Sequence, residues 1–146
     1  MKNENFFKNL IVASTAMMMI TGLLFLASCS PEQSAPAING KWVSSGGTGI
    51  EISGSTGVFY SFSSSWQEFA DAGFVNIGSS NLNNISKINS SEWNCDVLWM
   101  KRIDGIPTSV HWATDGTIVL SSNENTITVS ATLDAGPASA TYTRVL

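Results

Sequence analysis

The fold class follows from the stretch EWNCDVLWMK, residues Glu92–Lys101. Every second position holds a side chain suited to a buried face: Trp93, Cys95, Val97 and Trp99. Successive side chains of a β-strand point to opposite faces, so these four share one face and the polar Asn94 and Asp96 lie on the other. The stretch therefore predicts a strand with one face in a core.

Similar short runs, separated by Gly, Asn, Ser and Asp, continue on both sides of this strand. The other predicted strands are Gly40–Ser45, Thr48–Ser53, Val58–Ser63, Phe74–Gly78, Asn81–Ile88, Ser109–Ala113, Thr117–Ser121, Thr126–Ala131 and Ala140–Val145. Asp115-Gly116 lies between two of them and is typical of a hairpin turn that needs positive φ. Many short strands at this spacing predict an all-β domain, either a small barrel or a β-sandwich.

One segment has helical rather than strand spacing. Ser65 followed three residues later by Glu68 fits a capping box with Ser65 as the N-cap. The apolar side chains that share one face of this helix are Trp66, Phe69 and Ala70. Gly73 stands where a glycine commonly ends a helix. We expect a two-turn helix across one end of the barrel, either as a plug that belongs to the core or as a lid over a cavity.

The two ends of the domain carry a further pattern. The first predicted strand opens with Gly40-Lys41-Trp42, and the last one holds Arg144. This resembles lipocalins and avidins, whose first strand carries a Gly-x-Trp motif and whose last strand carries an arginine that packs over the tryptophan. The resemblance implies a lipocalin-like, antiparallel up-and-down β-barrel of about eight or nine strands, closed by Trp42 and Arg144. No avidin-like set of ligand-binding residues is recognisable, so no biotin site is carried over.

The N-terminal segment has the pattern of an export signal. Two lysines precede the nineteen-residue uncharged stretch Leu10–Ser28, which is also about long enough for a membrane-spanning helix. Its ending, Leu26-Ala27-Ser28-Cys29, resembles the lipobox of bacterial lipoproteins. That resemblance implies a signal peptide over residues 1–28 and a lipid anchor on Cys29, in the bacterial cell envelope. Ser30 in place of aspartate implies the outer membrane.

The chain beyond the predicted cleavage site divides into two parts. Residues 29–39 hold the lipidated cysteine and a flexible tether with two prolines, and residues 40–146 form the β-barrel domain. The whole chain has a formal charge of −4, with seven basic and eleven acidic residues and no basic run, so nucleic acid is not expected as a partner. The membrane is the expected partner, reached through the lipid.

Few residues are suited to catalysis. Cys95 is the one thiol left after lipidation, and the sole histidine, His111, is expected on the solvent face of its strand, away from Cys95. Most carboxylates fall in expected turns, and no set of His, Cys, Asp and Glu has metal-ligand spacing. We therefore expect a protein that is not an enzyme, with no catalytic residue, no metal and no cofactor.

The tryptophans are the remaining functional signal. If the barrel encloses a cavity of ~300 Å³ or more, the side chains expected to line it and bind a small apolar ligand are Trp66, Trp93, Trp99 and Trp112. The alternatives are a structural or interaction lipoprotein, such as an adhesin or inhibitor, with a filled core, and a carbohydrate-binding protein with exposed tryptophans. Of these three, we expect non-catalytic binding of a small apolar ligand in the barrel.

Overall fold

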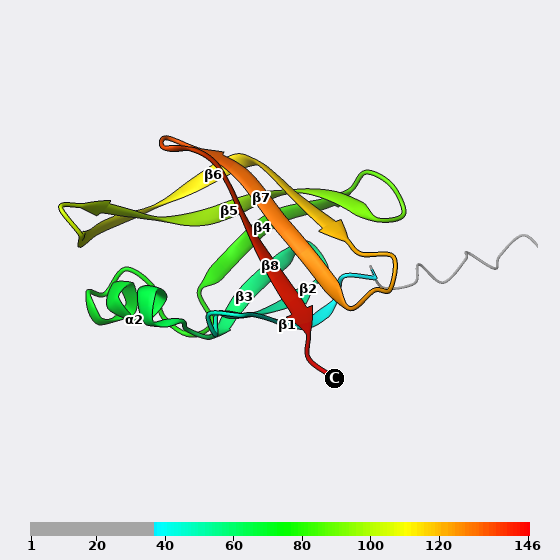
Figure 1. Ribbon diagram of the computed structural model, residues 1–146, viewed down its shortest axis with the longest axis horizontal. Helices are drawn as coiled ribbons and strands as arrows, with labels where there is room; N and C mark the ends of the chain where they lie inside the picture. The colour runs from blue at the N-terminus through cyan, green and yellow to red at the C-terminus, as the bar shows by residue number, and fades with distance from the viewer. Residues whose placement is uncertain (1–36) are drawn as a thin grey trace, which may run out of the picture. The chain divides into compact units, whose positions relative to one another are not determined.

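The computed structural model describes residues 37–146, which form eight strands and one short helix (Figure 1). The strands are β1 (Gly40–Ser44), β2 (Gly49–Ser53), β3 (Thr56–Ser61), β4 (Ser80–Lys87), β5 (Glu92–Ile103), β6 (Ile106–Leu120), β7 (Thr126–Leu133) and β8 (Gly136–Arg144), and the helix is α2 (Ser64–Asp71). The predicted signal peptide, Cys29 and the first part of the tether lie outside the described residues. Within residues 37–146, no helix has the length and apolar character needed to cross a membrane.

The eight strands close into an antiparallel barrel in which each strand pairs with its neighbours in the sequence. The barrel closes between β1 and β8, where Trp42 lies opposite Arg144 and Val43 opposite Thr143. The prediction of an all-β, up-and-down barrel with one short helix is confirmed, and the alternative of a β-sandwich is wrong.

The interior of the barrel is filled by large apolar side chains. The largest side chains that are fully buried are Trp42, Trp93, Phe59, Phe69, Ile38, Ile50, Ile52, Leu82, Ile118 and Ile127. They come from strands on all sides of the barrel, from α2 and from the residue that leads into β1. Burying one such side chain stabilises the fold by about 1.5–3 kcal/mol. The packed interior therefore provides much of the stability of the barrel.

The expected strand Phe74–Gly78 is wrong. This segment is a loop, in which Val75 is the one buried side chain while Ile77 is exposed. The reason lies in the end of α2, where Gly73 has φ +81° and the Phe74 N–H donates to the Phe69 carbonyl at 2.9 Å. This helix-ending hydrogen bond uses backbone groups that a strand would need.

The start of α2 also differs from the prediction. Ser63, and not Ser65, is the N-cap, because its extended backbone lets its hydroxyl accept a hydrogen bond from the Trp66 N–H. Ser65 and Glu68 therefore lie inside the helix, and no Ser65–Glu68 capping box forms. The prediction that Gly73 ends the helix is confirmed. Gly73 has the left-handed conformation and directly follows the C-cap residue Ala72.

The two expected strands Ser109–Ala113 and Thr117–Ser121 are one long strand, β6. Asp115-Gly116 is therefore no hairpin turn, and the φ angle of Gly116 is not positive. It lies at an irregularity in the pairing of β5 and β6, where an added Cβ would be 2.7 Å from the Cys95 carbonyl oxygen. Close backbone approach explains this glycine.

The true hairpin turn lies earlier, at Asp104-Gly105. Both residues have positive φ, +51° and +80°, and they connect the paired residues Ile103 and Ile106. This is the two-residue turn that matches the twist of an antiparallel pair. Because the turn lies this far along the chain, β5 and β6 are the two longest strands, and their hairpin projects beyond the rest of the barrel (Figure 1).

Candidate functional site

An open cleft lies where the β5–β6 hairpin separates from β7 and β8. Pairing of β6 with β7 covers only Thr117–Leu120, and upstream of Thr117 the two strands diverge. The cleft between them has a volume of about 390 Å³. Its lining residues are Trp99, Met100, Lys101, Arg102, His111, Trp112, Ala113, Thr132, Leu133, Asp134 and Ala135. Ligand sites in proteins have volumes of this order, ~300–1,000 Å³.

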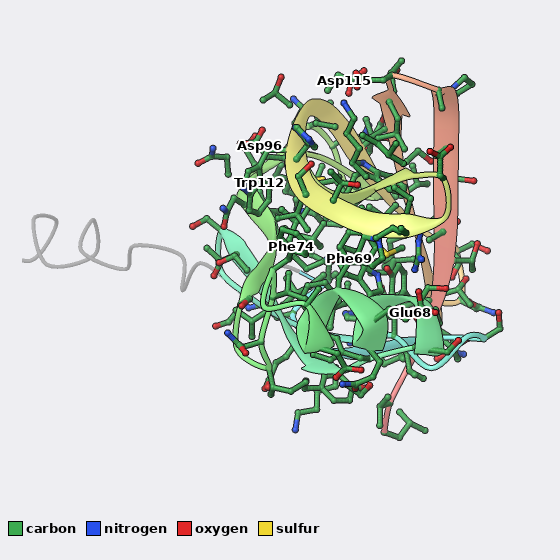
Figure 2. The ribbon with its side chains drawn as sticks, turned by 90° about the vertical axis from the view of Figure 1, so that its left-hand side faces the viewer. Glu68, Phe69, Phe74, Asp96, Trp112 and Asp115 are labelled. Atoms are coloured by element: carbon green, nitrogen blue, oxygen red, sulfur yellow. The ribbon has the colours of Figure 1, made fainter. Side chains whose placement is uncertain are left out.

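Asp115 lies at the position where β6 and β7 diverge, and its side chain links the two strands. Its carboxylate accepts a hydrogen bond from the Thr132 N–H at 3.2 Å, and Figure 2 places Asp115 beside β7 and β8. Hydrogen bonds from Thr132, first from its side chain and then from its backbone, lower the pKa of Asp115. The ionised Asp115 side chain thus accepts the hydrogen bond of the Thr132 N–H, which continued pairing of β6 with β7 would otherwise satisfy.

The helix α2 supports the other side of the β5–β6 hairpin. The Arg102 guanidinium donates to Glu68 Oε2 at 2.6 Å and to the Ser65 carbonyl at 3.3 Å, and it lies 5.0 Å from the Phe69 ring centroid. Figure 2 shows Phe69 between the helix and the hairpin that arches above it. In α2, Trp66 packs against Phe59 with ring centroids 4.7 Å apart. Both helix aromatics are buried, so α2 plugs this end of the core.

The cleft brings together two of the four tryptophans that the sequence suggests for ligand binding. Trp99 is half-buried and Trp112 is 41% exposed, and both line the cleft. Trp66 and Trp93 are core residues, 6% and 1% exposed. Trp112 is therefore the one tryptophan with a largely open face, so no second exposed indole is available beside it as a stacking platform for a sugar.

The cleft also contains residues that the sequence did not single out. Met100 and Leu133 add apolar surface, and Asp134 forms an ion pair with Lys101 at 3.8 Å. The signal that could have found them is Asp104-Gly105, since a hairpin turn at this position implies that β5 and β6 run beyond their neighbours. With Arg102 bound to Glu68, both cations of the cleft face a carboxylate.

Two indole N–H groups on β5 remain unsatisfied. Trp93 Nε1 and Trp99 Nε1 are buried and have no hydrogen-bond acceptor among residues 37–146. An unsatisfied buried donor costs about 1–3 kcal/mol. The bulky, apolar part of each indole offsets this cost by filling the barrel and its mouth.

Trp42 and Arg144 lie at the far end of the barrel from the cleft. The Arg144 guanidinium is 4.2 Å from the Trp42 ring centroid and donates to the carbonyls of Ala37, Asn39 and Glu124. The strand β8 runs from Gly136, beside the cleft, to Arg144, a distance of about 26 Å at ~3.3 Å per residue. Residues 37–39 therefore join the barrel at the end opposite the cleft. In Figure 1 the start of the described chain, in cyan, lies away from the tip of the β5–β6 hairpin.

Cys95 and His111 are not brought together. Cys95 is 2% exposed and pairs with Gly116, whereas His111 is exposed, pairs with Trp99 and is 2.8 Å from Ser109 Oγ. Burial, with a smaller effect of the Asp96 charge, raises the pKa of the Cys95 thiol from 9.0 to about 12. The thiol is protonated at neutral pH and has no base beside it. Within residues 37–146, no group of three or more His, Cys, Asp and Glu side chains could hold a metal ion.

The raised pKa of Cys95 predicts a loss of stability at alkaline pH. The unfolded thiol ionises near pH 9 and the folded one near pH 12, so the thiol's contribution to the free energy of unfolding is constant below pH 8 and falls as the pH rises above 9. Burial also raises the pKa of Tyr142 to about 12, which extends the decline above pH 10. Urea denaturation at pH 7–11 measures the slope. Cys95→Ala should remove the part between pH 9 and 10, and an unchanged slope would contradict the buried thiol as its cause.

Comparison of the chain with protein-family models, with curated protein sequences and with solved structures finds no match.

Proposed function

We propose that this protein is a lipid-anchored, non-catalytic binding protein of the bacterial cell envelope, which recognises an apolar group in the cleft beside Trp99 and Trp112. The observation that carries the proposal is the cleft itself. It places the exposed Trp112 and the half-buried Trp99 together in one hollow beside a filled barrel. A ligand therefore binds at the mouth and not inside.

The position of the cleft supports its exposure to a ligand. The described chain begins at the opposite end of the barrel, where Arg144 binds the carbonyls of Ala37 and Asn39. With an anchor on Cys29, the tether would join the barrel at the end opposite the cleft, so the point of attachment leaves the cleft uncovered. This is the arrangement expected of a receptor surface on an anchored protein.

The anchor is tested by metabolic labelling. Radiolabelled palmitate should enter the wild-type protein and should be lost completely in Cys29→Ala, because the lipid is attached to this sulfur. Cys95→Ala is the matched control and should keep its label, since the buried, protonated Cys95 thiol is no acceptor. Equal labelling of wild type and Cys29→Ala would end the proposal of a lipid anchor, whatever the cleft binds.

Binding in the cleft is tested by tryptophan fluorescence. The purified protein is titrated separately with a long-chain fatty acid, haem, an oligosaccharide and a library of linear peptides. A ligand of the cleft should change the fluorescence of the wild type and bind at least about tenfold more weakly to Trp112→Ala, since exposed aromatic anchors dominate such sites. If no probe distinguishes wild type from Trp112→Ala, the cleft is not the binding site.

A further inference from the structure

The β5–β6 hairpin has a long strand edge without a strand partner. The part of β6 from Ile106 to Gly116 pairs with β5 on one side, and on the other side no strand of residues 37–146 pairs with it. Every second residue of such a strand directs its backbone N–H and C=O toward the open side. An edge of this kind is a template for another strand.

The opposite edge of the hairpin has contacts of a different kind. Pairing of β4 with β5 ends at Leu82 and Val97. Nearer the tip, the Arg102 side chain of β5 contacts Ser65, Glu68 and Phe69 of α2. The cleft lies on the β6 side, between this strand and the β7–β8 turn.

The devices that usually prevent edge pairing lie toward the two ends of the open edge, at Pro107, at Asp115 and at the irregularities of the β5–β6 pairing, and not at its centre. Proteins protect such edges with charged side chains, proline or bulges. The segment Ser109–Ala113, SVHWA, holds no Lys, Arg, Asp, Glu or Pro, and Pro107 stands nearer the tip of the hairpin. Its side chains include a valine, a histidine and a tryptophan, two of which are residue types favoured in strands.

The cleft limits what can pair with this edge. Across it stand Leu133, Asp134 and Ala135, at the β7–β8 turn. A cleft of about 390 Å³ between β6 and this turn has room for a short stretch of extended chain and not for a second copy of the barrel. The charges of the cleft already face one another, as Lys101 does with Asp134, which favours an uncharged occupant.

We infer that the β6 edge at Ser109–Ala113 receives an extended, uncharged peptide segment of a partner protein, which adds to the hairpin as a further strand. This inference rests on the proposed function and names its ligand class. The peptide backbone provides the hydrogen bonds, and a large apolar side chain of the peptide packs against Trp112.

The test uses linear 12-residue peptides displayed on phage and selected on the immobilised full mature protein. The tightest peptide is synthesised, and each of its residues is N-methylated in turn, which removes one backbone donor and leaves the side chain. Strand addition predicts at least a tenfold loss of affinity at every second residue of a run of about five. Trp112→Ala should weaken binding about tenfold. Val119→Ala is the matched control, because Val119 lies on the same strand and is 45% exposed, but in the part that β7 already pairs.

Hydrogen exchange provides an independent readout. Backbone amides of Ser109–Ala113 that face the cleft should exchange rapidly in the free protein and become protected when the peptide binds. An N-methyl scan without a period of two, or a selection that yields no peptide sensitive to Trp112→Ala, overturns the inference. So does protection of the same amides by self-association without peptide. If a fatty acid or haem binds in a Trp112-dependent manner and peptides do not, the proposed function stands and the strand addition falls.

Discussion

Gly116→Ala should lower the free energy of unfolding by about 2–3 kcal/mol, the usual cost of forcing an extra methyl group into a packed site. The new Cβ would lie 2.7 Å from the Cys95 carbonyl oxygen and would overlap Val97 Cγ2. A side-chain methyl group can turn away, but the carbonyl belongs to the paired strand β5. Relief therefore requires β5 and β6 to move apart at the base of the hairpin. Urea denaturation followed by tryptophan fluorescence measures the change.

Gly46→Ala is the matched control for this substitution. Gly46 lies in an exposed turn, where an added Cβ would meet Ser63 Cβ at 3.8 Å, an ordinary contact. Its stability should change by no more than about 0.5 kcal/mol. The double variant Gly116→Ala/Val97→Ala separates the two contacts. It should lose less than the sum of the single losses, because the Val97 overlap is removed while the carbonyl contact remains. A Gly116→Ala variant as stable as Gly46→Ala would contradict the close approach of β5 and β6.

Alternation of apolar and polar residues was enough to predict the architecture. Trp93, Cys95 and Val97 face the core as their period of two requires, and the buried Ile50 and Ile52 follow the same rule. A closed barrel satisfies this pattern in every strand at once, since each strand has one face inside. The core could therefore be predicted without knowing how the strands are paired.

The position of the hairpin turn could not be predicted from the local Asp-Gly pattern. Asp104-Gly105 and Asp115-Gly116 are the same dipeptide, yet one forms a hairpin turn and the other lies within a strand. The difference lies in what surrounds them. Cys95 and Val97 press against Gly116 from β5, and no such contact occurs at Gly105. Because the contact depends on strand register, it has no signal in the local sequence. The projecting hairpin with its cleft was missed because the turn was assigned to Asp115-Gly116 and not to Asp104-Gly105.

Arg144→Ala should lower the free energy of unfolding by about 2–3 kcal/mol. The guanidinium donates to three backbone carbonyls, at 2.6 Å to Ala37, 2.9 Å to Glu124 and 3.1 Å to Asn39, while its face covers Trp42. Its loss removes charge-assisted hydrogen bonds and a cation–π contact together. The three carbonyls belong to two segments, residues 37–39 before β1 and the β6–β7 loop, so the barrel loses the side chain by which β8 holds both of them.

The Arg144→Ala substitution should open the β1–β8 seam locally at urea concentrations below those that unfold the whole barrel. Hydrogen exchange at the β1–β8 seam, measured at the Val145 amide, which donates to the Lys41 carbonyl, should accelerate in Arg144→Ala at urea concentrations where the amides of β5 stay protected. Arg144→Lys should recover part of the lost stability, because lysine keeps the charge but lacks the planar fork that reaches several carbonyls. Lys87→Ala, which removes an exposed cation from β4, should leave both readouts within about 0.5 kcal/mol of the wild type. A uniform rise in exchange across β1, β5 and β8 would contradict a closing role, because it would mean that Arg144 stabilises the whole fold without holding the seam.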